Sequence, residues 1–302
     1  MAILRIERAR YGVEDLETCV RFFEDFGLTL QAADRNGAEL VTRVGQVVEL
    51  RREDDPTLPP AVESGSTLRE LVWGIDTQQS LDNVIEDLRR DRVVEVDADG
   101  VAHTHDETGF GLGLAVADIV EPPVTTDETN RYGAVKRWNV PTSPTDQVFP
   151  LRMCHVAWNI PKDGHREAVA FYVDRLGFRI TDDVLPMGTF MQCEGDDDQH
   201  NLLLCHRPDR AGINHISYEV RNFDEVILGG NQMIERGWRE ARRLGRHTVG
   251  SNVFRFVHAP CGGRAEYAAD MDRVDETYTT RVHEVTPPHH RWTMLTNKDG
   301  ES

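Results

Sequence analysis

Two stretches of the sequence share one plan: YGVEDLETCVRFFEDFGL at residues 11–28 and HVAWNIPKDGHREAVAFYVDRLGF at residues 155–178. Each contains apolar residues at helical spacing, and each closes on a glycine, Gly27 or Gly177. Apolar residues three and four positions apart form one stripe of a helix, and glycine is a common helix stop. We therefore predict a corresponding helix in each half. The two stripes are Leu16, Cys19, Val20 and Phe23, and Ala168, Phe171, Tyr172 and Leu176.

Two further helical stripes lie at Leu81–Leu88 and Phe223–Ile234, and short β-like runs fill the segments between helices. Each helix follows one such run and precedes about three, and the whole pattern recurs after about 145 residues. Repetition of this kind indicates duplicated units. We predict an α+β fold of four βαβββ modules in two paired domains, each an incomplete mixed β-barrel.

Composition sets the expected domain limits. The N-terminal domain is expected over residues 1–120 and the C-terminal domain over residues 151–275. Residues 121–150 contain five prolines and little periodicity, which is typical of a linker. Residues 276–302, with His289–Trp292, are expected to form an exposed tail rather than a cover over a pocket.

Acidic residues outnumber basic ones, with 52 Asp and Glu against 34 Lys and Arg and a formal charge of −18. This charge repels phosphate backbones and anionic membrane surfaces, so neither nucleic acid nor a membrane is an expected partner. The N-terminus lacks the apolar run of a signal peptide, and no stretch approaches the roughly 20 apolar residues of a membrane span. The five cysteines include no CxxC pair, which favours reduced thiols and a cytoplasmic location.

Most of the twelve histidines lie after residue 150, and His155 and His215 lie in β-like runs. Glu266 lies in a third such run, RAEYAAD. Strands that present these three side chains on one face would form the two-histidine, one-carboxylate triad typical of non-haem iron(II). We predict one metal site, in the second half. The counterpart positions in the first half offer no such set: Tyr11, Glu70 and Leu114.

The second half resembles the extradiol ring-cleaving catechol dioxygenases of the vicinal oxygen chelate superfamily. The most specific part of the resemblance is a motif that ends at the glutamate. Its residues are, in order, Gly245-Arg246-His247, Phe256, Ala259-Pro260, Gly262 and Glu266. The resemblance covers the architecture of roughly residues 1–280 and the motifs of residues 152–270. It implies that His155, His215 and Glu266 are metal ligands, with iron(II) usual and manganese(II) an occasional substitute.

The same resemblance implies roles for residues around the metal. The family's acid–base histidine falls fifteen residues before the second ligand, which corresponds to His200, and its substrate-pocket histidine corresponds to His247. Imidazole suits acid–base work because it holds or releases a proton near neutral pH. Three more residues are expected to help orient the substrate: Asn159, Arg242 and Arg243.

One position departs from the family pattern. Phe256 stands where the family usually has a tyrosine that is hydrogen-bonded to the bound catecholate. Loss of a hydrogen bond to a charged partner costs about 1.5–3 kcal/mol. The departure therefore predicts slow turnover of simple catechols, a more acidic substrate, another hydrogen-bond donor, or a different reaction on the same metal.

The activity that the resemblance implies is cleavage of a catechol-type aromatic ring by dioxygen, beside a hydroxyl-bearing carbon, in a homo-oligomeric enzyme. Two alternatives stay open at this point. One is another metalloenzyme of the superfamily, of the isomerase type. The other is a non-catalytic homologue that binds a small aromatic molecule.

Overall fold

The computed structural model describes residues 2–121, 129–142 and 145–295. Two consecutive βαβββ units make up the first half: β1 (Ile3–Val13), α1 (Leu16–Phe26), β2 (Thr29–Ala33), β3 (Gly37–Val41) and β4 (Val47–Arg52), then β5 (Thr67–Ile75), α2 (Gln78–Leu88), β6 (Glu95–Val96), β7 (Ala102–His105) and β8 (Gly111–Val116). No helix within these described ranges is long and apolar enough to cross a membrane.

The second half repeats the order and adds two strands. Its elements are β9 (Arg152–Pro161), α3 (His165–Ala170), η1 (Phe171–Arg175), β10 (Arg179–Val184), β11 (Gly188–Gln192), β12 (Leu202–Arg207), β13 (Gly212–Glu219), α4 (Phe223–Glu235), β14 (Glu240–His247), β15 (Val253–His258), β16 (Arg264–Ala269), β17 (Arg281–His283) and β18 (His290–Thr293). The predicted α+β fold of four βαβββ modules is thus confirmed.

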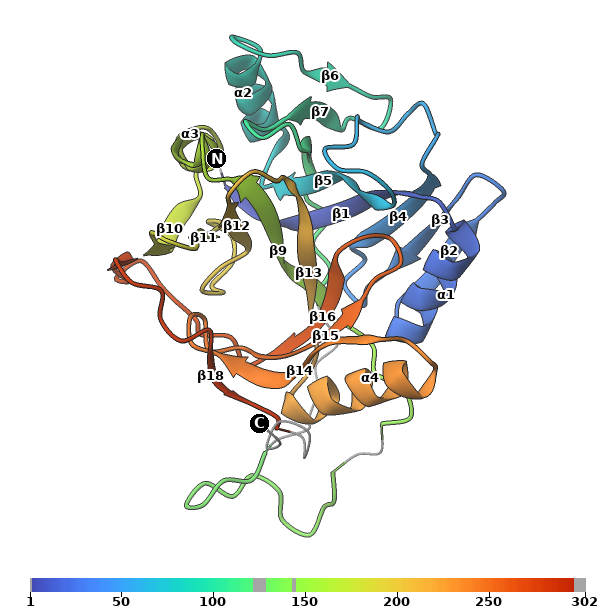
Figure 1. Cartoon of the computed structure of the whole chain (residues 1–302), viewed down its shortest axis with the longest axis vertical. Helices are drawn as coiled ribbons and strands as arrows, with labels where there is room; N and C mark the ends of the chain where they lie inside the picture. Colours follow the sequence, from blue (N-terminus) through green and yellow to red (C-terminus); the bar gives the residue numbers. More distant parts are fainter. Residues whose placement is uncertain (1, 122–128, 143–144, 296–302) are drawn as a thin grey trace.

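The modules pair into two open mixed sheets, with the helices at the periphery and the first strands of the modules near the middle of the molecule (Figure 1). The first sheet has the order β2-β3-β4-β1-β5-β8-β7-β6, and the second has the order β17-β10-β11-β12-β9-β13-β16-β15-β14-β18. In both, the central pair is antiparallel, β1 with β5 and β9 with β13. Neither sheet closes on itself, in agreement with the incomplete barrels that we expected.

The predicted helices form where the stripes lie, with one difference. The side chain of Asp15 accepts a hydrogen bond from the backbone of Thr18 at the start of α1, and Gly27 ends the helix at φ 103°, where a side chain would be strained. The counterpart in the second half begins as α3 and continues as the wider π-helical turn η1. The wider turn still buries Phe171 and Tyr172 in the core.

The two halves share one hydrophobic core. The ring of Phe26, at the end of α1, stacks on Tyr267 of β16 with centroids 3.9 Å apart, and the Tyr267 hydroxyl donates to the carbonyl of Phe26 at 2.8 Å. The buried side chain of Gln46 donates to the carbonyls of Ile6 and Met153, one in each half, at 2.7 and 3.1 Å. Contacts of this kind hold the second half against the first.

Most described residues after residue 276 are exposed, as expected, but they form two short strands rather than a free tail. Strand β17 pairs with β10 and strand β18 pairs with β14, so the tail adds one strand to each edge of the ten-stranded sheet. The segment between them crosses from one edge to the other (Figure 1). Unpaired edge strands expose backbone donors and acceptors, and the tail satisfies them. Periodicity could not reveal this, because these strands are only three and four residues long.

Candidate metal centre and its cavity

His155, His215 and Glu266 come from three neighbouring strands, β9, β13 and β16. Ser217 lies opposite His155 on one side and opposite Glu266 on the other, and His215 is two residues before it. Side chains two apart on a strand share a face, so this register brings the three groups together. A one-residue slip in any of the strands would remove one of them.

The three donor atoms converge on one point. Nε2 of His155 lies 3.1 Å from Nε2 of His215, and Oε2 of Glu266 lies 3.2 and 3.3 Å from these two nitrogens. Donors about 2.1 Å from a shared ion lie roughly 3.0–3.4 Å from one another. Oε2 of Glu266 is buried without a hydrogen-bond donor in the described chain. The donor set and its spacing therefore fit a divalent transition metal.

Charge states in the centre also suit a metal. Burial lowers the pKa of His215 to about 3, so its imidazole is neutral near pH 7. Burial also opposes ionisation of Glu266, but contacts with His155 and His215 outweigh it and hold the pKa of the carboxyl well below its usual value. Neutral imidazole and ionised carboxylate are the forms that bind metals.

A second layer of polar groups orients these side chains. Asn214 contacts Nδ1 of His215 through its Oδ1 at 2.9 Å and donates to Oδ1 of Asn159 at 2.9 Å. Asn252 donates to Oε1 of Glu266 at 3.1 Å. Such partners fix ring orientation and tautomer at metal sites. Asn159 therefore lies behind the centre, and we place it as a support of Asn214 rather than as the expected substrate contact, because it does not line the cavity.

Sequence reasoning did not find Asn214 or Asn252. Asn214 directly precedes His215 in the run INHISYEV, and Asn252 lies between His247 and Phe256 in the stretch that carried the family resemblance. Both positions were readable, but an asparagine beside a strand histidine has no chemical signature until its side-chain direction is known.

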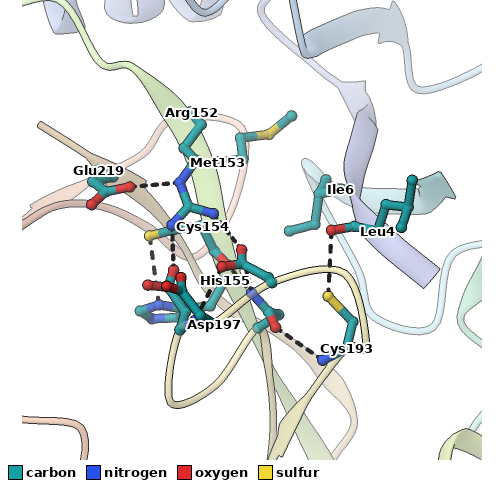
Figure 2. A network of polar contacts seen from close by, with 12 residues as sticks. Leu4, Ile6, Arg152, Met153, Cys154, His155, Cys193, Asp197 and Glu219 are labelled. Atoms are coloured by element: carbon teal, nitrogen blue, oxygen red, sulfur yellow. Dashed lines mark hydrogen bonds and ion pairs between the residues drawn. The ribbon is translucent and has the colours of Figure 1, made fainter. Parts of the chain in front are cut away.

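An ion-pair network holds the strand that leads to His155 (Figure 2). Arg152 pairs with Asp196, with Asp198 at 2.6 Å and with Glu219 at 2.5 Å. These carboxylates raise the pKa of the guanidinium despite its burial, which by itself lowers it. Asn201 donates to the carbonyl of Cys154 at 3.2 Å. The network joins β9 to the 193–201 loop, so the positions of His155 and of the residues before β12 are linked.

A cavity of about 230 Å³ opens onto the centre. It brings together six of the nine predicted site residues, namely His155, His200, His215, Arg242, His247 and Phe256. Its other walls are mainly apolar, and the tail contributes Thr286–His289. The crossing segment of the tail is therefore a wall of this cavity.

His200 is held in one orientation from behind. Its Nδ1 lies 2.7 Å from Oε1 of Gln199, whose Nε2 donates to Oδ2 of Asp182 at 2.7 Å. Asp182 in turn contacts the Tyr278 hydroxyl at 2.9 Å and Nε2 of His283 at 2.6 Å, both in the tail. Because the amide oxygen only accepts, Nδ1 carries the hydrogen and Nε2 is left as a proton acceptor. Burial, followed by the neighbouring His155, lowers the pKa of His200 well below its usual value.

Of the remaining predicted residues, three line the cavity and one does not. The ring of His247 stacks on Phe254 with centroids 4.0 Å apart, and burial lowers its pKa to about 3. Phe256 meets His215 edge to face, with centroids 5.0 Å apart. Arg242 lines the cavity, whereas Arg243, the next residue on β14, does not. Neighbours on a strand point to opposite faces, so only one of this pair can reach the cavity.

The first half has no equivalent centre among its described residues. Glu70 is buried and pairs with Arg10 at 3.1 Å and with His103 at 2.7 Å. Two counterparts that we expected were misplaced, because Tyr11 and Leu114 belong to the hydrophobic core. Side chains alternate between the two faces of β1, so residues such as Arg10 lie on its polar face. An ion-pair cluster occupies the place that the metal ligands take in the second half.

Fold and centre together define a paired βαβββ protein with a two-histidine, one-carboxylate centre in its second half. Residues 152–267 match the sequence model of the Glyoxalase/Bleomycin resistance protein/Dioxygenase superfamily.

Curated relatives match part of the chain. Metapyrocatechase 2 of Cupriavidus necator is 34% identical over 139 residues, which are 46% of this chain and 42% of the relative. Biphenyl-2,3-diol 1,2-dioxygenase of Paraburkholderia xenovorans strain LB400 is 29% identical over 126 residues, or 39% of this chain and 41% of the relative. The matched region thus spans about two fifths of the length of these curated relatives.

Solved structures match the whole fold. A halotolerant catechol dioxygenase, BphC, aligns with a TM-score of 0.74 at 14% identity, over 99% of this chain and 96% of that chain. The Mn(II)-bound glyoxalase of Novosphingobium aromaticivorans aligns with a TM-score of 0.72 at 21% identity, over 96% and 91%. These likenesses establish the shared architecture of both halves.

Proposed function

We propose that this protein is a metal-dependent extradiol dioxygenase that cleaves the ring of a catechol-type substrate with dioxygen. The observation that carries the proposal is a centre of His155, His215 and Glu266 that opens into a cavity also lined by His200 and His247. The sequence similarity of the chain to metapyrocatechase and to biphenyl-2,3-diol dioxygenase supports it. Iron(II) is the proposed metal, with manganese(II) as the alternative.

Three ligands on one face leave the other coordination positions open toward the cavity. When bound, an iron(II) ion would supply a site for both catechol oxygens and for dioxygen and a path for electrons between them. His155, His215 and Glu266 would hold it. Asn214 and Asn252 would keep two of these ligands in place through the contacts described above.

The protein's own contribution is orientation and proton transfer. His200 presents Nε2 to the cavity beside His155, with ring centroids 4.4 Å apart, and is placed to take a proton from a catechol hydroxyl and return it later. His247 lies on the other side of the centre, with Nε2 3.9 Å from Oε1 of Glu266, and is placed to contact a ring oxygen. Phe256 supplies an apolar wall against the ring and no hydroxyl.

The second candidate is an isomerase-type metalloenzyme of the same superfamily. The observation in its favour is the fold likeness to a manganese-bound glyoxalase. The non-catalytic binding alternative is less well supported, because the triad is buried and its donor atoms converge.

Oxygen consumption distinguishes these candidates. Protein loaded with iron(II) without oxygen is mixed with a panel of catechols in air-saturated buffer, while an oxygen electrode and visible absorbance are followed together. We expect oxygen uptake with the appearance of a yellow ring-cleavage product. Iron-loaded protein that consumes no oxygen with any catechol of the panel would contradict the dioxygenase and favour the isomerase. The expected cytoplasmic location and homo-oligomer stay predictions, the latter to be checked by light scattering.

A further inference from the structure

Three guanidinium groups line the cavity: Arg207 at the end of β12, Arg242 on β14 and Arg264 on β16. Among the described residues, no Asp or Glu forms an ion pair with any of the three, although acidic residues outnumber basic ones in the chain. Most other buried or half-buried arginines of this structure, such as Arg152, pair with carboxylates. Unpaired arginines in a largely apolar cavity call for an anionic partner.

The contacts that hold these arginines are all to neutral groups. Arg264 donates to the carbonyl of Asn214 at 3.4 Å and also to its side-chain oxygen. Arg242 approaches Nε2 of His289 at 3.4 Å, and Arg207 donates to the carbonyl of His206 at 2.9 Å. Guanidinium groups keep their positive charge in proteins near neutral pH, so these neutral contacts do not compensate it.

The position of the arginines relative to the metal centre follows from Phe256. The guanidinium carbons of Arg242 and Arg264 lie 5.5 and 5.0 Å from the centroid of its ring. The same ring lies 5.0 Å from the imidazole of His215. Arg242, Arg264 and the proposed ligand His215 therefore border the same aromatic ring.

The charges around the cavity indicate the charge of the ligand that binds there. The arginines contribute three positive charges and a divalent metal two more, while Glu266 contributes one negative charge. A fully ionised catechol supplies two negative charges, so positive charge remains in excess. All three arginines are half-buried, and charge that is partly removed from water without a partner is unfavourable. A neutral substituent on the catechol would leave this excess uncompensated.

We propose that the substrate is a single-ring catechol bearing a carboxylate, on the ring or on a short arm, which Arg242 and Arg264 bind at the side of Phe256, with Arg207 nearby. The planar guanidinium fork matches a carboxylate in shape and charge. The cavity of about 230 Å³ is large enough for one aromatic ring that bears such a group. That the ligand is a catechol rests on the proposed dioxygenase activity. The site for an anion does not depend on that activity.

The turnover test compares acids with their neutral amides on iron-loaded protein. The pairs are 3,4-dihydroxyphenylacetate, 3,4-dihydroxybenzoate and 2,3-dihydroxybenzoate, each with its carboxamide. We expect kcat/KM for at least one acid to exceed that of its amide by on the order of tenfold or more. Arg242→Gln should bring this ratio close to one. Equal kcat/KM for every acid and its amide would overturn the inference and leave the dioxygenase standing.

A binding test separates the anion site from the chemistry. Calorimetry without oxygen measures Kd for 3-hydroxybenzoate and 3-hydroxybenzamide, which have one hydroxyl and cannot chelate as catechols do. We expect the acid to bind on the order of tenfold tighter, and Arg242→Gln to abolish the difference. Preference for the acid without oxygen uptake on any catechol would support the anion site and contradict the dioxygenase. No preference in either test would overturn the site.

Two further variants guard against a folding artefact. Arg264→Lys keeps the charge but loses the fork, and should reduce the acid-to-amide ratio less than Arg242→Gln does. Arg210→Gln removes the same charge from an exposed position three residues after Arg207, and should leave the ratio unchanged. A ratio that falls equally in Arg210→Gln would assign the preference to bulk charge and overturn the inference.

Discussion

Nδ1 of His200 lies 2.7 Å from Oε1 of Gln199, and Nε2 of Gln199 donates to Asp182 at 2.7 Å. The chain of contacts continues to His283 of the tail, 2.6 Å from the same carboxylate group. An imidazole held in this way has one tautomer, with the free nitrogen directed to the cavity. A residue that never touches substrate thus determines the state of the proposed acid–base group.

Kinetic measurements on variants distinguish the roles of His200 and Gln199. We expect His200→Ala to keep bound iron and to lower kcat on the order of 10²–10⁴-fold, the usual range for a general acid–base group. Gln199→Leu keeps the imidazole but removes its hydrogen-bond acceptor, so a smaller loss of kcat is expected. Steady-state oxygen uptake with metal analysis of each variant measures both. If His200→Ala strips the metal instead, His200 is a ligand and the proposed role is wrong.

Metal content tests the convergent centre directly. We expect close to one iron or manganese per chain after loading without oxygen, and nearly none in His215→Ala, because two donors bind far less tightly than three. Metal that binds only the folded state raises the melting temperature. The shift in Tm on adding iron(II) should therefore disappear in the variant. His258→Ala, at an exposed position of β15, is the matched control and should keep both the metal and the shift.

Loss of the ion pairs of Arg152 should lower the stability of the folded protein. Its guanidinium contacts carboxylates of the 193–201 loop and of β13, and its side chain is 20% exposed. Removing one member of a largely buried ion pair leaves the others without a partner and costs about 3 kcal/mol or more. We therefore expect Arg152→Met to lower the free energy of unfolding in urea by about that amount.

A surface arginine provides the comparison for Arg152. Arg52 pairs with Asp54 at 3.4 Å, and both side chains are more than half exposed. Exposed pairs contribute about 0–1 kcal/mol, so Arg52→Met should be nearly neutral. Equal losses for the two variants would show that the Arg152 network does not hold β9 to the loop.

A buried aspartate between the halves predicts a pH effect. Burial raises the pKa of Asp106 to about 6, against hydrogen bonds from Tyr172 and the backbone that lower it. Tyr172 lies in the other half and donates to Oδ2 of Asp106 at 2.8 Å. Because the folded pKa lies above the unfolded value of about 3.9, this residue's contribution is complete below pH 4. It is lost as pH rises through 6.

Asp106→Asn removes that titration and keeps an oxygen for the backbone donors. Relative to the variant, we expect the free energy of unfolding of the unaltered protein to fall by about 2–3 kcal/mol between pH 4 and pH 7. Urea titrations at several pH values measure the difference. Parallel curves for the two proteins would show that Asp106 titrates normally in the folded state.

The elements and their repetition were readable from the sequence because they depend on local periodicity. Apolar residues such as Phe23 and Phe171 recur at helical spacing in matching places of the two halves, and the strands between them alternate. Gly27 marks the helix end that its positive φ requires. The candidate ligands His155, His215 and Glu266 were found because residue type and spacing carry metal chemistry by themselves.

The supports of the centre were not readable in the same way. Asn252, Gln199 and Asp182 are polar residues near strand ends, where most such residues face water, and only their side-chain directions reveal a role. Tyr11 and Leu114 were assigned as counterparts of ligands, yet they pack in the core, since a shift of one residue moves a side chain to the opposite face. Register is set by pairing across the sheet, which periodicity alone does not specify.

By itself, the sequence determined an α+β fold of four repeated βαβββ units and a single candidate set of two histidines and a glutamate. The tertiary structure alone decided that Arg207, Arg242 and Arg264 face one cavity with no carboxylate partner among the described residues, and that Thr286–His289 lines it. The physical reason is that helices and strands form through contacts a few residues apart. A cavity forms where strands distant in the chain pair and curve, so its lining depends on the register of every strand in the sheet.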